Sequence, residues 1–244
     1  MNNWITPNWP ATSNIQAFFT TRQGGFSRDL YAGFNLGDHV GDNPLLVQKN
    51  RAELRNTLPG EPRWLKQVHG KTLVWVDKDN RILPEADAAL SCHPGVICAV
   101  LTADCLPVFL CNDAGTIVSV VHARWRGLAA GIIERTVTEM DSNGIMAYLG
   151  PAIGPDYFEV GEEVREIFIQ HDKRSAVAFT PHHKEKKGKW FANIFLLAQQ
   201  RLTEIGITKI YSSYECTFSD PTRFFSHRRD GNTGRMAGLI WITN

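Results

Sequence analysis

The hydrophobic pattern is most informative from Val96 to Gly127, where two runs rich in Val, Ile, Leu and Phe flank a turn sequence, Asn112–Gly115. This pattern predicts a β-hairpin. If Asn112 and Gly115 close the turn, the strands pair in a register that places Cys105 opposite His122. Directly opposed residues hold their Cβ atoms about 5 Å apart, so the two side chains could share one metal ion or one proton. Pro107 cannot donate to the strand ladder, which suggests a sheet edge or a bulge just beyond the cysteine.

Other segments carry helical or strand periodicity. Asp42 or Asn43 is a candidate N-cap for the first helix, with Pro44 at its first position. The turn-rich segment Gly150–Pro155 is the best candidate for a boundary between subregions. Apolar spacing predicts helices over Leu45–Leu58, Leu128–Met140, Val160–His171 and Ala192–Ile205, strands over Ile15–Thr20, Leu73–Val76, Ser175–Phe179 and Ile207–Phe218, and a second hairpin over Phe224–Ile242 around Gly231–Gly234.

Several basic residues stand where an anion could bind. Arg22 lies in the glycine-rich turn Thr21–Gly25, which suits phosphate or carboxylate, although a solvated arginine in a flexible turn explains the same residues. Arg126 precedes the helix at Leu128, whose N-terminus favours an anion. In the C-terminal hairpin, one of Arg228 and Arg229 points inward and needs either a protein carboxylate or a bound phosphate.

The composition is that of an ordinary globular protein, and we expect the 244 residues to form one domain, 1–244. The net charge of +1 predicts no nucleic-acid partner. The chain opens without a signal peptide, and no apolar run approaches the roughly 20 residues that span a bilayer, so we expect a cytoplasmic protein without membrane contact. The five cysteines form no CxxC pair, and Cys98 and Cys111 are expected to be core residues.

Three residues in separate segments, His69, Cys105 and His122, form a candidate N₂S metal site. Three protein ligands with an open fourth position are typical of catalytic zinc. Taken alone, a histidine at a strand bend is more often a structural residue than a metal ligand, and this applies to His69. Asp104 stands beside the cysteine, where it could orient a ligand or a substrate hydroxyl. A metal-free alternative uses Cys105 as a thiolate nucleophile with His122 or His69 as its base.

Copper also binds two histidines and one cysteine. Electron-transfer copper usually adds a weak axial methionine, and the four methionines stand outside the motif segments. The eight histidines form no His-x-His pair, so multicopper chemistry is disfavoured. The run His182–Lys189 predicts a solvated loop, because its lysines repel cations from the neighbouring histidines.

Seven ordered motifs resemble the YfiH-type laccase-domain family, and together they cover nearly the whole chain. Proteins of this family were once called polyphenol oxidases and are now regarded as purine nucleoside phosphorylases. The motifs are Thr20-Thr21-Arg22-x-Gly24-Gly25, Asn35-Leu36-Gly37-x-His39-Val40-Gly41-Asp42, Gln67-Val68-His69-Gly70, Thr102-Ala103-Asp104-Cys105-Leu106-Pro107, His122-Ala123-x-Trp125-Arg126-Gly127-Leu128, Leu149-Gly150-Pro151-Ala152-Ile153-Gly154 and Phe225-Ser226-x-Arg228-Arg229-Asp230.

The resemblance implies a single α+β domain in which mixed β-sheets are flanked by helices as αββα layers. It also implies zinc, with copper as the alternative, held by His69, Cys105 and His122. The implied activity is phosphorolysis of adenosine, inosine and S-methyl-5′-thioadenosine, with adenosine deamination as a further activity. The alternatives are a Cys/His-dependent hydrolase, or amidase, acting on peptidoglycan precursors, and a copper polyphenol oxidase.

The implied ligands are a small nucleoside and phosphate, bound by a monomer or homodimer. With Cys105, His69, His122 and Asp104 as the catalytic set, we hypothesise that Arg22, Arg126 or Arg228 places the phosphate, because phosphorolysis needs preorganised positive charge. The motifs add two more candidates, and the substrate- or phosphate-binding set is then Arg22, Asn35, Gln67, Arg126 and Arg228.

Two positions depart from the family pattern. The family usually has Gly where this chain has Arg124, and Tyr where it has His227. If position 124 needs a positive φ, a non-glycine residue adds strain of about 1 kcal/mol. The cation beside the metal could weaken zinc binding or strengthen phosphate binding.

Overall fold

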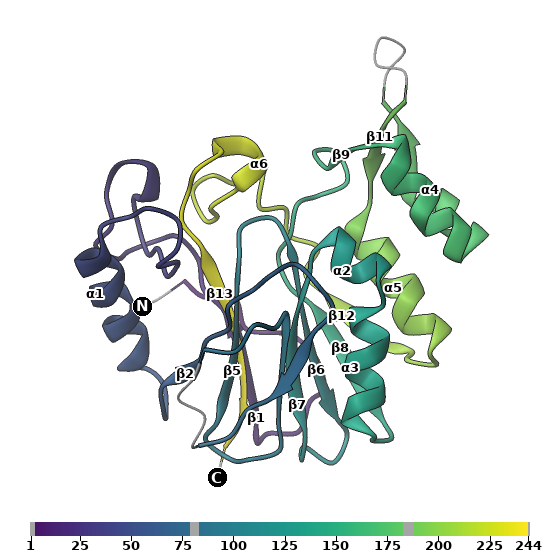
Figure 1. Ribbon diagram of the computed structural model, residues 1–244. Helices are drawn as coiled ribbons and strands as arrows, with labels where there is room; N and C mark the ends of the chain where they lie inside the picture. The colour runs from purple at the N-terminus through teal and green to yellow at the C-terminus, as the bar shows by residue number, and fades with distance from the viewer. Residues whose placement is uncertain (1–2, 79–82, 183–187, 244) are drawn as a thin grey trace.

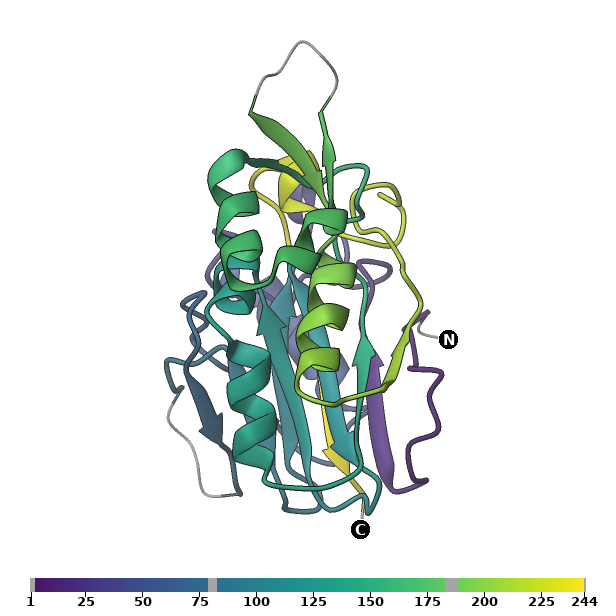
Figure 2. The same cartoon turned by 90° about the vertical axis from the view of Figure 1, so that its right-hand side faces the viewer.

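Two β-sheets pack face to face, with helix α1 (Pro44–Arg55) on the outer face of one sheet and several helices on the outer face of the other (Figures 1 and 2). The computed structural model describes residues 3–78, 83–182 and 188–243. A four-stranded sheet has the order β1 (Ile15–Phe19), β13 (Met236–Ile242), β5 (Ile97–Thr102), β2 (Pro62–Arg63). A six-stranded sheet has the order β12 (Lys209–Ser212), β8 (Ile145–Leu149), β6 (Leu106–Asn112), β7 (Val118–Ala123), β4 (Ala88–Ser91), β3 (Leu73–Trp75).

A small third sheet stands at one end of the sandwich, beside the short helix α6 (Figure 1). It has the order β10 (Phe179–Pro181), β11 (Lys189–Ala192), β9 (Glu159–Gly161). The helices are α1 (Pro44–Arg55), α2 (Trp125–Ala129), α3 (Ile132–Met140), α4 (Glu162–His171), α5 (Ile194–Glu204) and α6 (His227–Asp230), with 3₁₀ turns over Asp29–Tyr31 and Lys173–Ala178.

The core has three layers that follow this stacking. Between the sheets, Val100 and Ile240 belong to the same buried cluster as Phe109 and Val120. On the outer face of the four-stranded sheet, strand residues pack with Leu54 of α1. The outer face of the six-stranded sheet packs against α3 and α5, and α4 lies beside β9 and β11 of the small sheet (Figure 1). Strands buried on both faces explain the continuous apolar runs of the sequence, and the predicted αββα architecture of an α+β fold is confirmed.

The predicted register of the central hairpin is wrong by two residues: His122 pairs with Pro107, and Cys105 lies outside the strand. The loop is longer than a two-residue turn because the side chain of Asn112 accepts hydrogen bonds from the backbone N–H groups of Thr116 and Ile117, at 2.9 and 3.2 Å. A slip of two residues leaves every side chain on its original face. His122 therefore still points to the side from which Cys105 approaches.

Helix predictions near the site hold with changed ends. Asn43 caps α1 by accepting a hydrogen bond from the N–H of Leu45, and Pro44 is the first helical residue. The helix predicted over Leu128–Met140 is two helices, because Gly131 adopts φ +84° between α2 and α3. The helix predicted from Val160 begins at Glu162, after strand β9.

The C-terminal hairpin prediction is wrong. Ser226 caps the short helix α6 by accepting a hydrogen bond from the N–H of Arg229, and β13 pairs with β1 and β5. Two further segments differ from expectation. Ser175–Phe179 is mostly a 3₁₀ turn capped by Asp172, and the strand predicted over Ile207–Phe218 is limited to β12. The turn-rich segment Gly150–Pro155 lies between β8 of the six-stranded sheet and β9 of the small sheet.

Cys98 and Cys111 are fully buried, as expected, and burial raises the pKa of both thiols. Most of the predicted loop His182–Lys189 lies outside the described residues. Within the described ranges, no helix combines the length and apolar character needed to cross a membrane.

Candidate active site and metal centre

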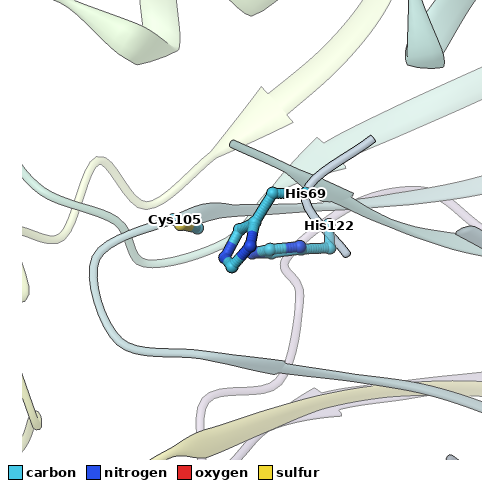
Figure 3. A group of neighbouring side chains, drawn as sticks. All are labelled: His69, Cys105 and His122. Atoms are coloured by element: carbon cyan, nitrogen blue, oxygen red, sulfur yellow. The ribbon is translucent and has the colours of Figure 1, made fainter. Parts of the chain in front are cut away.

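The three candidate metal ligands converge at the end of the sandwich where the chain crosses between the sheets. Cys105 lies in the link between β5 of the four-stranded sheet and β6 of the six-stranded sheet, His122 lies near the end of β7, and His69 precedes β3. Figure 3 shows the two imidazole rings side by side, with Cys105 next to them. Their ligand atoms all lie within 4.8 Å of one another, and the ring centroids are 5.1 Å apart.

The crossing link is held by Asp104, which has a left-handed φ of +90°. Its carboxylate accepts hydrogen bonds from the Thr217 hydroxyl at 2.7 Å and from the Arg228 N–H at 2.6 Å, and its carbonyl accepts one from the Ile153 N–H at 3.0 Å. Strain of about 1–3 kcal/mol persists only where the surroundings over-determine the conformation. Asp104 thus fixes the backbone that presents Cys105.

His69 also has a left-handed backbone, with φ +62°. The Asp87 carboxylate accepts hydrogen bonds from the N–H groups of His69 and Gly70, at 2.9 and 2.7 Å. Gly127 of α2 lies against this turn so closely that a Cβ atom there would stand 2.6 Å from the Gly70 carbonyl oxygen. The family motif glycine at 127 is therefore required by close packing of α2 on the histidine turn.

The same carboxylate orients His122. Its Oδ1 lies 2.9 Å from Nδ1 of His122, and the Asp87 carbonyl accepts a hydrogen bond from the His122 N–H at 2.7 Å. An ionised carboxylate can only accept a hydrogen bond, so Nδ1 of His122 carries the proton. In the neutral ring, Nε2 then carries the free lone pair. A carboxylate behind a metal-ligating histidine is the usual arrangement that fixes its tautomer.

The charges of the site follow from these contacts. Burial lowers the pKa of His122, but the Cys105 thiolate and the Asp87 hydrogen bond outweigh it and raise that pKa to about 9. Partial desolvation, with the charges of His122 and Arg124, lowers the pKa of His69 to about 4. Burial opposes ionisation of Asp87, yet hydrogen bonds from His122 and the Gly70 N–H keep its pKa below the usual value.

The donor set fits a metal ion. Two imidazoles and one thiolate are ligands that zinc and copper accept, and three protein ligands leave a coordination position open. In the ranges that the structure describes, this is the one group of three or more such side chains close enough to share an ion. One three-ligand site is a poor match for a multicopper centre, in agreement with the sequence argument.

The three ligands open into a cavity of about 620 Å³, within the usual range for small-molecule sites. Its apolar lining residues are Ile153, Phe158, Val160, Val164 and Ile194. Its charged lining residues are the cations Arg124, Arg126, Lys189, Arg228 and Arg235 and the carboxylates Asp104, Glu159 and Glu163.

Arg124 adopts φ −67° and ψ 153°, so the backbone strain considered for this position does not exist. Extended backbone accepts any residue, and the guanidinium lines the cavity beside the metal ligands. His227, the second departure from the family pattern, also lines the cavity. Its Nδ1 donates a hydrogen bond to the Gly231 carbonyl at 2.6 Å, which ties α6 to the following turn.

Two of the predicted substrate-binding residues do not line the cavity. The Arg22 guanidinium donates to the carbonyls of Pro221 and Ala32, at 3.2 and 3.1 Å, and stacks on Phe225. Asn35 is fully buried. Its side-chain oxygen accepts from the N–H groups of Gly37 and Arg235, at 2.9 and 2.8 Å.

The other three do line it. Gln67 pairs with the backbone of Leu101, accepting from its N–H at 2.7 Å and donating to its carbonyl at 2.8 Å. Arg126 is exposed and stacks on Trp125. Arg228 donates to the Glu159 carbonyl at 2.9 Å and so joins α6 to β9.

Sequence reasoning missed Asp87 and Arg235. A carboxylate directly before the apolar run Ala88–Ser91 is a signal, because a buried charge needs partners, but the sequence does not say which partners. Arg235 directly precedes β13. The sequence pattern predicts a hairpin there, and a hairpin gives no reason for Arg235 to lie near the candidate metal ligands.

A family model described as multi-copper polyphenol oxidoreductase laccase matches residues 16–243. The chain belongs to the YfiH-type laccase-domain family. It is 47% identical over 246 residues to purine nucleoside phosphorylase YfiH of Escherichia coli, covering 99% of this chain and 100% of that one. Identity to purine nucleoside phosphorylase PA4543 of Pseudomonas aeruginosa is 46% over 244 residues, or 99% of each chain.

Solved structures of the YfiH-type family have the same fold. Protein NMB0706 of Neisseria meningitidis superposes with a TM-score of 0.94 at 42% identity, over 99% of this chain and 100% of that one. YlmD of Geobacillus stearothermophilus gives 0.88 at 30% identity, over 99% and 96% of the two chains. The family assignment therefore rests on both sequence and fold.

Proposed function

We propose that this chain is a zinc-dependent purine nucleoside phosphorylase. The observation that carries the proposal is the convergence of His69, Cys105 and His122 in a cavity lined by both apolar side chains and cationic ones. A purine ring suits the apolar side chains, and phosphate suits the cationic ones. The names of the two bacterial relatives support the same reaction class.

In this reaction a phosphate oxygen bonds to the anomeric carbon of the ribose while the bond from that carbon to the purine nitrogen breaks. The bonding electrons leave with the base, which takes up a proton. Zinc held by the three ligands would supply Lewis acidity beside the bound nucleoside. The chain's own arginines hold the phosphate dianion against the cation-like sugar, which is an electrostatic role.

The proposed substrates are adenosine, inosine and S-methyl-5′-thioadenosine, with adenosine deamination as a second activity of the same cavity. Deamination uses water in place of phosphate. Release of inosine from adenosine in phosphate-free buffer would support that second activity, and recovery of adenosine unchanged would exclude it.

One observation favours a second candidate, a Cys/His-dependent hydrolase or amidase acting on peptidoglycan precursors. Asp87 orients His122, and His122 lies beside Cys105, in the order carboxylate, imidazole and thiol that activates a cysteine nucleophile. This reading predicts activity that survives metal removal and is abolished by thiol alkylation.

The deciding experiment incubates zinc-quantified protein with inosine, with and without phosphate, for the wild-type chain and Cys105→Ala. Hypoxanthine that appears only with phosphate, and is lost in the variant and after chelation, would support the phosphorylase. Absence of hypoxanthine from zinc-loaded wild-type protein would overturn it. Hydrolysis of an amide substrate by the chelated protein would instead support the cysteine hydrolase.

A further inference from the structure

One arginine among the basic residues that line the cavity has no polar partner in the described part of the chain. In the portions of the chain that the structure describes, the Arg124 guanidinium makes no hydrogen bond and no ion pair, although its side chain is only partly exposed. The other arginines of the cavity lining are engaged, since Arg228 and Arg235 donate to backbone carbonyls and Arg126 stacks on an indole. A guanidinium fork that faces a cavity without a partner is suited to bind a planar or tetrahedral oxyanion.

Arg235 faces the same cavity from a different element. One of its nitrogens, Nη1, donates to the carbonyls of Thr233 and Gly234, at 2.8 and 3.0 Å, which leaves the rest of the fork available. Cys105 and Asp104 are among the negative groups whose charge acts on it. Asp104 accepts hydrogen bonds from Thr217 and from the Arg228 N–H, and among the described residues its carboxylate forms no ion pair with Arg235.

The loop before α1 is built to hold Arg235 in this place. Asn35 accepts the Arg235 N–H at 2.8 Å from a fully buried position. Gly37 lets the arginine stem pass, because a Cβ atom at position 37 would lie 2.8 Å from Cγ of Arg235. The Asn35-Leu36-Gly37 motif therefore shapes the cavity by positioning Arg235.

The two arginines flank the metal ligands. The positive charges of both act on the His69 ring, from the end of β7 in one case and the start of β13 in the other. A divalent ion held by two neutral imidazoles and one thiolate keeps a net positive charge. Two further cations beside the same ring favour an anion at that end of the cavity. The carboxylates Asp104, Glu159 and Glu163 also line the cavity, and the cations Arg124, Arg126, Lys189, Arg228 and Arg235 outnumber them.

We propose that Arg124 and Arg235 hold the attacking phosphate, and that Arg124 is a substrate-binding residue that this chain has in place of the usual family glycine. The inference rests on the function proposed above. It assigns the phosphate to different arginines from those suggested by the motifs. Arg22 lies outside the cavity, Arg126 stands exposed on Trp125, and Arg228 braces α6 against β9.

The test compares Arg124→Gln with Arg124→Lys and with Arg135→Gln, a control at an exposed position of α3 outside the cavity. Inorganic phosphate is titrated calorimetrically into zinc-quantified protein without nucleoside, and the KM for phosphate is measured with inosine. We expect Arg124→Gln to raise both constants about tenfold, the usual effect of losing one charged hydrogen bond. Arg124→Lys should recover part of the loss, and Arg135→Gln should match the wild type.

Two results separate this inference from the proposed function. Phosphorolysis by wild-type protein with an unchanged phosphate dissociation constant in Arg124→Gln overturns the assignment of Arg124 and leaves the phosphorylase intact. Weakened phosphate binding in Arg124→Gln, with no phosphorolysis by the wild type, supports the anion site and overturns the phosphorylase. Equal zinc content and melting temperature in all variants show that the comparison concerns folded, metal-loaded protein.

Discussion

The candidate metal centre and the arginines that line the cavity use polar groups in opposite ways. Behind the metal centre, the buried Asp87 accepts hydrogen bonds from His122 and from the N–H groups of His69 and Gly70, so the ligand geometry is held by the protein itself. In the cavity lining, Arg124 has no hydrogen bond within the described part of the chain, and Arg235 has a partly free fork. Groups that are fully hydrogen-bonded within the protein fix the geometry of the metal centre, whereas the arginines with free donors can bind a ligand. The contrast predicts which substitutions disturb the metal and which disturb substrate binding.

The largest effect is expected for Cys105→Ala. Loss of the thiolate removes one of three metal ligands, so phosphorolysis should fall by more than the roughly 100-fold seen for outer partners of metal ligands. Bound zinc should become substoichiometric, as measured by metal analysis. The matched control is Cys92→Ala at an exposed position, which should retain activity and zinc. Full activity in Cys105→Ala would contradict the proposed site.

A smaller effect is expected for Asp87→Asn. The amide keeps one acceptor oxygen but replaces the second with a donor, so His122 and the His69 turn cannot all remain satisfied. Zinc affinity should fall about 10–100-fold, as measured by competition with a chelator. Asp113→Asn, which alters an exposed ion pair with Lys209, should leave the affinity unchanged. Equal zinc affinity in both variants would show that the geometry of the metal centre does not depend on Asp87.

The metal-free protein should lose stability as pH rises. In the folded chain the pKa of His122 is raised from 6.5 to about 9. The stabilising contribution of this imidazolium is therefore complete below pH 6.5 and is lost as pH rises through 9. Urea unfolding at pH 6.5 and pH 9.5 should reveal the loss, and Asp87→Asn should reduce the difference. A metal-free protein that gains stability over this range would contradict the expectation.

The smallest effect is expected for Gly37→Ala, which tests the position of the Arg235 side chain without altering a charge. The new methyl group would lie 2.8 Å from Cγ of Arg235, so the flexible side chain must move. The KM for phosphate should rise about threefold, less than for loss of a whole charged hydrogen bond. Zinc content should stay the same because no metal ligand contacts residue 37. A change in zinc content without a change in phosphate KM would contradict this division.

Much of the fold was predictable because its signals are local. Asn43 and Pro44 predict the start of α1, because the N-cap hydrogen bond and the proline at the first helical position need no tertiary partner. The apolar runs around Asn112 predicted strands and a hairpin correctly. The register failed because the Asn112 side chain bonds to Thr116 and Ile117, which lengthens the loop by two residues. Turn length depends on side-chain hydrogen bonds that the turn sequence alone does not specify.

The C-terminal segment shows where local reasoning ends. Alternation and turn residues from Phe224 to Ile242 indicate a hairpin, yet β13 pairs with β1 and β5 from distant parts of the chain. Long-range pairing replaced a local one because β13 is apolar along its whole length and is buried on both faces. That placement, together with the helix α6 before it, brings Arg228 and Arg235 to the cavity.

The sequence by itself determined the family, the αββα layering that the family implies, and the three candidate metal ligands, because each is recorded in residue type and motif order. Only the tertiary structure decided that Asp87 orients both histidines, that Arg22 and Asn35 do not line the cavity, and that Arg124 lines it without a polar partner among the described residues. The reason is physical. Residue types define what a group can bind, but the partner that satisfies a buried donor, acceptor or charge comes from whichever distant segment the packing places beside it.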